Sequence, residues 1–317
     1  MEIIRIVEES EIGVVRTLRE IVIHPSVYYK WYNEYLQEGY EGLARKKRNQ
    51  FWNQIPPWEK QRVVKYALER PDLSPRELAC HITDKYHYFI SESSVYRILK
   101  SYDLITSPAY ILMSASDSFR NPTSHVNELW QTDFTYFRVV GWGWYFMSTI
   151  LDDYSRYIIT WKLFKTMAAD DVKETLDEAI RATGVEHVKV NHKPRLLSDN
   201  GPCYVSDELK QYLKRQGMEH TRGAPYHPQT QGKIERYHRS MKNVVKLEHY
   251  YFPWELERAI GQFVEYYNHH RYHESLSNVT PADVFFGRDH EILARRNRIK
   301  QQTMLQRRRE NRNLKVA

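Results

Sequence analysis

Residues 129–164 read LWQTDFTYFRVVGWGWYFMSTILDDYSRYIITWKLF. Three runs in this segment, 129–140, 144–151 and 157–164, are rich in β-branched and aromatic residues. Only a few turn residues separate them, and this spacing predicts an antiparallel meander of three strands. Asp133 stands in the middle of the first strand, where aspartate is disfavoured. A buried carboxylate without a partner is costly, and a bound cation would remove that cost.

The segment that follows alternates between helical and strand patterns. We expect a helix over 168–183, a short buried strand over 194–198, a helix capped by Ser206, a strand over 219–223 and a long helix over 230–247. The resulting order, β-β-β-α-β-α-β-α, is that of a ribonuclease-H-like α/β fold. A further amphipathic helix is expected over 253–273, ahead of Thr280-Pro281.

Two more carboxylates occupy positions that favour a site. Asp199 follows the strand 194–198 at its carboxyl end, where the sites of α/β sheets gather. Glu235 lies on the long helix, with 35 residues between it and Asp199. Taken singly, Asp199-Asn200-Gly201 is also typical of a turn, and Glu235 of a surface glutamate paired with Arg239. The spacing is therefore a stronger argument than either residue alone.

These segments together resemble the insertion-sequence transposases that share a retroviral-integrase catalytic core, the Asp-Asp-35-Glu superfamily. The matching motifs are WQTDFT at 130–135, LSDNG at 197–201 and PQTQGKIER at 228–236, with Lys242 seven residues beyond the glutamate. The resemblance is close over 127–287 and looser over the N-terminal part of the chain.

The resemblance implies a DNA transposase with Asp133, Asp199 and Glu235 as its catalytic and metal-binding residues. Such carboxylates suit two Mg²⁺ (or Mn²⁺) ions, which prefer hard oxygen ligands. Two ions about 4 Å apart would clamp the attacking and leaving oxygens of a phosphodiester. Asp133 and Asp199 would share one ion, and Glu235 would hold the second. Water would first free a 3′-OH at the end of the element, and that hydroxyl would then attack target DNA.

DNA contacts are expected around this triad. Lys233, Arg239 and Lys242 would contact phosphates near the scissile bond. Tyr226 and His227, in the loop before the long helix, would either touch DNA or form a simple turn between Pro225 and Pro228.

The N-terminal part reads as two helical modules. Residues 1–39 predict helices over 2–9, 12–20 and 25–38. In the third helix Val27, Trp31 and Tyr35 would form the apolar face. The outward-facing candidates for DNA contact are Ser26, Lys30 and Asn33. The pattern fits a helix-turn-helix, although an ordinary three-helix module is an equal alternative.

The second module, over 58–105, has a capping box at Ser74-Pro75-Arg76-Glu77. Residues 85–90 have strand character, and Ser91 or Ser93 would cap a helix that follows. This order favours a second helix-turn-helix, winged if the strand forms.

Charge concentrates at the C-terminal end. The chain carries a net charge of +7, and residues 294–317 hold nine Lys or Arg against one acid. Such a tail either binds phosphates by counterion release or is a solvated, disordered end.

The predicted organisation is multidomain. It consists of an all-α helix-turn-helix module (1–45), a basic linker (46–57), the second module (58–105), a linker (106–126), the ribonuclease-H-like integrase core (127–248), a C-terminal helical segment (249–290) and a basic tail (291–317). The expected partners are the terminal inverted repeats of the element, target DNA and further copies of the chain, in a dimer or larger assembly on DNA.

Several function classes are not expected. Two cysteines exclude a disulfide framework, and no Gly-x4-Gly-Lys-Ser/Thr motif indicates ATP use. His269 and His273 stand at i, i+4, but no third zinc ligand accompanies them, so zinc is not expected. No apolar run is long enough for a membrane span and the N-terminus lacks a signal-peptide apolar region, so an intracellular protein is expected. The resemblance implies the bacterial cytoplasm or nucleoid. Asp152-Asp153 is interpreted as a turn that supports the core.

The remaining alternative functions are a nuclease that cuts without joining and a regulator that has lost catalysis.

Overall fold

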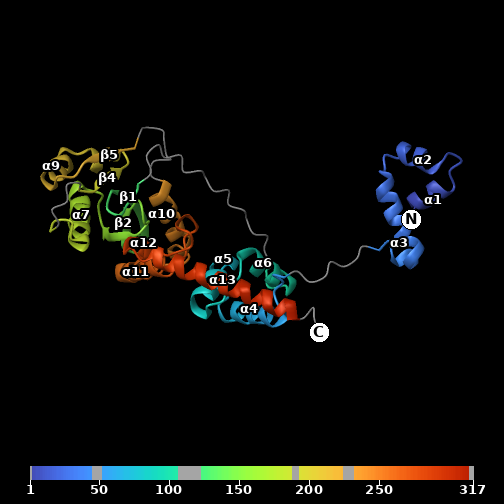
Figure 1. The fold of residues 1–317 in the computed structure, drawn as a ribbon. Coiled ribbons are helices and arrows are strands. Elements are labelled where there is room, and N and C mark those ends of the chain that lie inside the picture. The colour runs from blue at the N-terminus through green and yellow to red at the C-terminus, as the bar shows by residue number, and fades with distance from the viewer. Residues whose placement is uncertain (1, 45–51, 106–122, 188–192, 224–231, 314–317) are drawn as a thin grey trace. The chain divides into compact units, whose positions relative to one another are not determined.

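The computed structural model describes residues 2–44, 52–105, 123–187, 193–223 and 232–313 (Figure 1). By its internal contacts the chain divides into two units, residues 1–54 with 307–317 and residues 55–306. No helix of the described residues is both long and apolar enough to cross a membrane.

The N-terminal unit contains three helices, α1 (Glu2–Glu8), α2 (Val14–Glu20) and α3 (Pro25–Glu38), followed by a 3-10 turn at Gly39–Glu41. The three predicted helices are therefore confirmed. Their small core is made of Ile4, Val7, Leu18 and Tyr28.

The predicted apolar face of α3 (Val27, Trp31 and Tyr35) is wrong at Val27, whereas Tyr35 packs against the core as predicted. Tyr28 is the buried residue, and its ring stacks on Tyr32 with 5.7 Å between centroids. Val27 is 38% exposed. The helix is rich in aromatic residues on several sides, so apolar spacing alone did not determine which side packs. Ser26, Lys30 and Asn33 are exposed, as expected of outward-facing residues, and Ser26 Oγ lies 2.7 Å from His24 Nδ1.

The second helical module contains α4 (Pro57–Glu69), α5 (Pro75–Tyr86) and α6 (Glu92–Ser101). Ser74 forms the predicted capping box with Glu77, and Ser91 caps α6. The strand predicted over 85–90 is wrong, because α5 continues to Tyr86 and residues 87–90 join no sheet. The amide N–H of Phe89 donates to Thr303 Oγ1 at 3.0 Å instead of to a neighbouring strand.

The tail is helical where the structure describes it, so of the two alternatives the disordered end is wrong through Asn313. Helix α13 spans Asp289–Asn313. Ile299 and Thr303, four residues apart, are buried. Arg296 pairs with Asp84 of α5 at 2.6 Å, with 13% of its side chain exposed. One of the basic residues therefore serves packing, which composition alone did not reveal.

A five-stranded mixed sheet is the centre of the second unit, in the order β3-β2-β1-β4-β5. Strands β1 (Leu129–Val139), β2 (Gly143–Asp152) and β3 (Ile158–Phe164) form the predicted antiparallel meander. Strands β4 (Arg195–Ser198) and β5 (His220–Arg222) add in parallel on the other side of β1.

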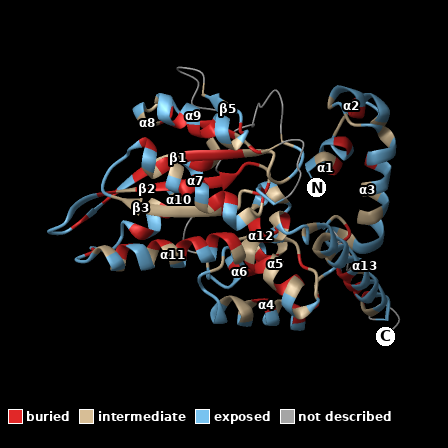
Figure 2. Cartoon of the chain, turned by 90° about the vertical axis from the view of Figure 1, so that its left-hand side faces the viewer, coloured by how far each residue is buried: buried red, intermediate tan, exposed pale blue. Residues whose placement is uncertain are grey.

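Helices cover both faces of this sheet (Figures 1 and 2). One face packs against α7 (Ala169–Thr183), α8 (Pro202–Val205) and α9 (Asp207–Gln216) around Trp130 and Leu176. The other packs against α10 (Gly232–Val245) and α11 (Pro253–His269) around Met147 and Ile260. A 3-10 turn (Glu274–Leu276) and α12 (Pro281–Phe285) follow. The element order is that of a ribonuclease-H-like fold, as the sequence predicted.

His273 is partly buried, and we expect it to make the stability of the fold depend on pH. Burial lowers the pKa of His273 to about 3, and the charges of Arg271, Arg156, Arg76 and Arg236 add to the effect. His273 Nε2 has no hydrogen-bond partner within the described part of the chain. In the unfolded chain the imidazole titrates near pH 6.5. Stability from this group is therefore present above about pH 6.5 and lost as the pH falls.

We expect the free energy of unfolding to decrease by about 2 kcal/mol between pH 7 and pH 5 through His273 alone. Urea denaturation at the two pH values measures this decrease. His273→Phe removes the titrating group and should show a correspondingly smaller decrease. Equal decreases in the two proteins would show that another group is responsible.

Candidate catalytic pocket

Asp133 lies on β1, two residues beyond the last β1 residue that pairs with β4. In the described residues, β4 pairs with β1 at Leu129–Gln131. The edge that begins at Thr132 therefore has no β4 partner, while the opposite edge remains paired with β2 through Val139. Asp133 is partly exposed at this open edge, although most of the first strand is buried. The topology thus gives a mid-strand carboxylate access to solvent.

Asp199 follows the last residue of β4 directly. Its Oδ1 accepts a hydrogen bond from the Gly201 amide at 2.9 Å, the turn geometry that the Asp-Asn-Gly sequence favours. The residue is exposed, yet partial shielding of its carboxyl raises its pKa, and the negative charge of Asp133 raises it further. The two aspartates therefore act on each other electrostatically, and a cation between them would relieve that repulsion.

Glu235 lies in the first turn of α10. The helix buries Ile234, Tyr237 and Met241 against the sheet, and this packing leaves Glu235 exposed on the side of Asp133. Both carboxylates line one pocket of about 710 Å³. The other lining residues are Phe134, Thr135, His238, Arg239, Lys242, Asn243, Lys246 and Leu247.

The structure thus brings Asp133 and Glu235 into one pocket and places Asp199 within electrostatic reach of Asp133. It does not close the three into a compact set: no group of three or more His, Cys, Asp or Glu in the described ranges is close enough to hold a metal ion. The donor chemistry nevertheless fits a hard divalent cation, since all three are carboxylates and two of them repel each other.

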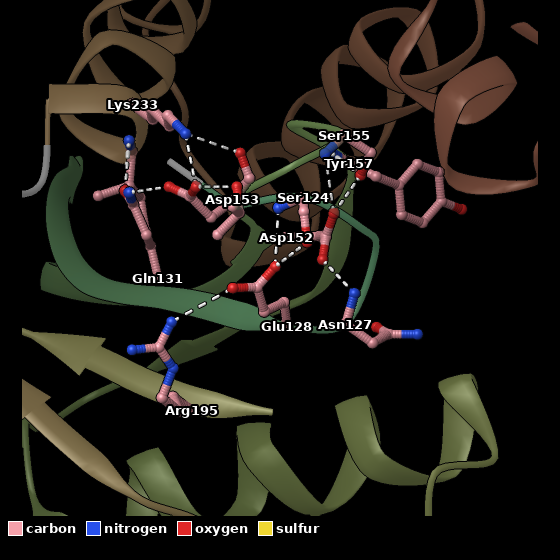
Figure 3. Close-up of polar contacts among 12 residues, drawn as sticks. Ser124, Asn127, Glu128, Gln131, Asp152, Asp153, Ser155, Tyr157, Arg195 and Lys233 are labelled. Carbon is pink, nitrogen blue, oxygen red and sulfur yellow. Dashed lines mark hydrogen bonds and ion pairs between the residues drawn. The ribbon is translucent and has the colours of Figure 1, made fainter. Parts of the chain in front are cut away.

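A buried polar network, which we call the clamp, ties α10 to β1 (Figure 3). Gln131 accepts a hydrogen bond from the Ile234 amide at 3.1 Å and donates to Asp153 Oδ1 at 2.7 Å. Lys233 Nζ donates to the Asp153 carbonyl at 3.0 Å and pairs with its carboxylate. Gln131 and Lys233 are each two residues from Asp133 and Glu235, so the clamp sets the spacing of the two carboxylates.

Asp152 and Asp153 have the supporting role that the sequence predicted (Figure 3). Asp152 accepts hydrogen bonds from the Asn127 amide and from the amide and hydroxyl of Ser155, at 2.6–2.8 Å. Burial raises the pKa of Asp153, while hydrogen bonds from Thr123 and Gln131 oppose the rise. Asp152 therefore stabilises the β2–β3 turn, and Asp153 is part of the clamp.

Lys233 is not among the residues that line the pocket of Asp133 and Glu235, and its expected contact with DNA phosphates stays a prediction. Its side chain is 13% exposed and engaged with Asp153, away from the pocket lining. Lys233 is two residues before Glu235, and side chains two positions apart on a helix point in different directions. Arg239 and Lys242 do line the pocket. Tyr226 and His227 lie outside the described residues.

His238 is a pocket residue that the sequence analysis missed. It is 5% exposed, with Nδ1 at 3.3 Å from Asp133 Oδ2 and Nε2 at 3.2 Å from Thr149 Oγ1. Because the His238 ring contacts Thr149 through one nitrogen and Asp133 through the other, it positions the Asp133 carboxylate. Its place three residues after Glu235, on the same helix face, was the available signal.

Comparison with known families agrees with this architecture. Residues 123–228 and 216–281 each match a model described as an integrase core domain, and residues 27–99 match a homeodomain-like domain. The chain therefore carries an integrase core, the catalytic domain of polynucleotidyl transferases, behind a homeodomain-like helical region. The latter match begins within α3 and ends within α6.

Individual relatives cover parts of the chain. A transposase for insertion sequence element IS629 of Shigella sonnei is 29% identical over 163 residues, 50% of this chain and 51% of that protein. The Gag-Pro-Pol polyprotein of mouse mammary tumor virus is 32% identical over 133 residues, 40% of this chain and 7% of the polyprotein. The chain thus spans about half of the first relative and less than a tenth of the second.

A search of solved structures matches part of the chain to the catalytic core domain of HTLV-2 integrase in complex with magnesium. That structure has a TM-score of 0.40 and 20% identity, over 51% of this chain and 97% of the other. The catalytic core domain of BIV integrase has a TM-score of 0.38 and 24% identity, over 52% and 97% of the two chains.

Proposed function

We propose that the protein is a DNA transposase that cleaves the ends of a mobile element and joins the freed 3′-OH to target DNA. The observation that carries this proposal is the pocket at the open edge of β1. It holds Asp133 and Glu235 beside the cations Arg239, Lys242 and Lys246, within an integrase core. Acidic groups suited to metal ions next to basic groups suited to phosphates favour chemistry on a phosphodiester.

Asp133, Asp199 and Glu235 are the residues that would hold the divalent metal, which we propose to be two Mg²⁺ ions, or Mn²⁺ in their place. Such ions supply Lewis-acid activation of the phosphodiester and of the attacking oxygen. Asp133 and Asp199 would share one position and Glu235 would serve the other. The clamp and His238 would hold Asp133 and Glu235 in place for metal binding.

The pocket cations have a separate task. Lys242 and Arg239 would neutralise the phosphates that flank the scissile bond, which positions the bond over the carboxylates. In the first step water attacks phosphorus and the 3′-oxygen leaves as a hydroxyl. In the second, that hydroxyl attacks a target phosphodiester, forming one P–O bond as another breaks.

Recognition of the DNA ends would come from the homeodomain-like region. Ser26, Lys30 and Asn33 are exposed on α3, and a helix of this kind reads the major groove in helix-turn-helix proteins. The partners we propose are the terminal repeats of an element, target DNA and further copies of the chain, because joining two ends requires two active sites.

Two other functions predict different behaviour. A nuclease of this fold would nick without joining, and a regulator would bind without cutting. The homeodomain-like region argues against the first, and the three carboxylates, which lie within the residues that the two integrase-core models match, argue against the second.

The test uses purified protein and DNA from both flanks of its gene, with Mg²⁺ or Mn²⁺. We expect metal-dependent 3′-end nicking by wild type and none by Asp199→Asn. Nicking by both proteins would reject the assigned site. Binding by both without nicking would favour the regulator.

His238→Ala should lower the nicking rate by about 10- to 100-fold through misorientation of Asp133, because partners of metal-binding carboxylates have effects of that size. Asn at this position can still donate to a carboxylate, so His238→Asn should recover part of the rate. Comparing rates across Mg²⁺ concentrations separates a change in metal affinity from a loss of folding. Equal rates in wild type and His238→Ala would remove the positioning role.

A further inference from the structure

Two exposed aromatic side chains stand beside the catalytic pocket, at the end of the β1–β2 hairpin. Tyr136 is 50% exposed and Trp144 is 51% exposed. Their rings meet edge to face, with centroids 5.5 Å apart and planes at 76°. Single exposed aromatic residues are common on this protein, but two rings that contact each other and stay open to solvent form a contiguous apolar patch, which favours a binding surface.

Two lysines of α10 converge on this pair. Lys242 Nζ lies 4.7 Å and Lys246 Nζ 5.5 Å from the centroid of the Tyr136 ring. In the part of the chain that the structure describes, neither ammonium has a carboxylate within ion-pair distance. Both lysines also line the pocket of Asp133 and Glu235. The aromatic pair and the catalytic carboxylates are therefore connected through the same two side chains.

We propose that Tyr136, Trp144, Lys242 and Lys246 form a binding site for an unpaired nucleotide of the DNA end, which we call the stacking site. The base would stack on the aromatic pair, and the lysines would bind its flanking phosphates. This inference rests on the proposed function and deepens it, because it assigns a single-stranded DNA segment to one border of the pocket.

The chemistry of the site favours single-stranded DNA over duplex. Every base has a π-face, so stacking on aromatic side chains tolerates any sequence, but the base must first leave its own stack. Lysine supplies phosphate contacts as a point charge without reading a base. A frayed or flipped end nucleotide satisfies both requirements, and its phosphate would point toward the carboxylates.

The test compares two DNA duplexes of the same sequence, one blunt and one with a five-nucleotide single-stranded overhang containing 2-aminopurine. Binding of the full chain is measured without divalent metal, so no cleavage occurs. We expect wild type to bind the overhang duplex about tenfold more tightly and to quench 2-aminopurine. Trp144→Ala and Tyr136→Ala should each remove most of that preference, while Trp144→Phe should retain it.

Trp254→Ala is the matched control. Trp254 is also an exposed tryptophan, at 53%, with Arg258 5.3 Å from its ring, but it does not line the pocket. It should leave the preference for the overhang unchanged. Lys246→Gln should weaken binding of the overhang duplex and lower its salt dependence by roughly the 0.7 log units per log unit of salt expected for one single-strand phosphate contact.

Retention of the overhang preference by both alanine variants, with unchanged thermal unfolding, would overturn the stacking site. That result would leave the transposase proposal intact if wild type still nicks. Conversely, an overhang preference that depends on Tyr136 and Trp144 would support the stacking site even if nicking is absent.

Discussion

Asp133→Asn should lower the rates of both nicking and joining by about 10³-fold or more. The amide is nearly the same size as the carboxylate, but it carries no negative charge for a divalent cation. Loss of a metal position removes several kcal/mol of transition-state stabilisation, and about 4 kcal/mol corresponds to a factor of about 10³. Rates with flank DNA in Mg²⁺, measured under single-turnover conditions, report this loss directly.

The control for this variant is its affinity for DNA. Asp133 contributes no favourable charge to phosphate binding, so Asp133→Asn should bind the flank DNA at least as tightly as wild type. A variant that binds normally and nicks at more than a tenth of the wild-type rate would contradict the role of Asp133 as a metal ligand.

Asp153→Ala should lower the free energy of unfolding by about 3–5 kcal/mol, since removing one partner of a buried ion pair leaves the other charge uncompensated. The side chains of Asp153 and Lys233 are 3% and 13% exposed. Gln131 and Thr123 lose a hydrogen-bond acceptor in the same variant. Chemical denaturation followed by circular dichroism measures the change.

The matched comparison is the surface pair Lys162–Glu174, whose side chains are 37% and 52% exposed at a similar separation. Glu174→Ala should cost less than about 1 kcal/mol, because exposed pairs contribute little. If the two variants are equally stable, the clamp is not the buried structural element described here. Asp153→Asn is a milder clamp variant, because the amide oxygen can still accept hydrogen bonds from Gln131 and Thr123 while the ion pair with Lys233 is lost. Its nicking rate shows whether clamp geometry affects nicking.

The core of this protein could be predicted from sequence because its signals are local. In residues 129–164, three runs of strand-forming residues are separated by short turns, and Asp133 is a charged residue in the middle of the first run. The helix start at Ser74 also follows from local chemistry, since a capping box needs only four consecutive residues.

The predictions that differ from the structure concern residues whose conformation or contacts depend on partners distant in the sequence. Residues 85–90 have strand-forming composition, but the Phe89 amide bonds to α13 and no strand forms. The composition of the basic tail is compatible with a solvated end, but Arg296 pairs with Asp84, which lies more than 200 residues earlier in the chain. Lys233 pairs with Asp153, which lies 80 residues earlier in the chain and is not indicated by the sequence around Lys233.

His238 illustrates the same limit within the site. A histidine in a helix has many roles, and nothing in residues 232–245 alone indicates which acid it will meet. Its contact with Asp133 depends on the register between α10 and β1, which the clamp establishes. Sequence therefore predicted the carboxylates, and the structure supplied the residues that orient them.

The most direct test of the central claim is DNA joining. Flank DNA with a preformed 3′-OH end is incubated with wild-type protein, Mg²⁺ and a circular target, and the products are sequenced across the junctions. The transposase assignment predicts covalent junctions between the 3′ end and many target positions, and none with Asp199→Asn. Complete absence of junctions with wild type, under conditions in which it nicks the same flank DNA, would contradict it and identify a nuclease.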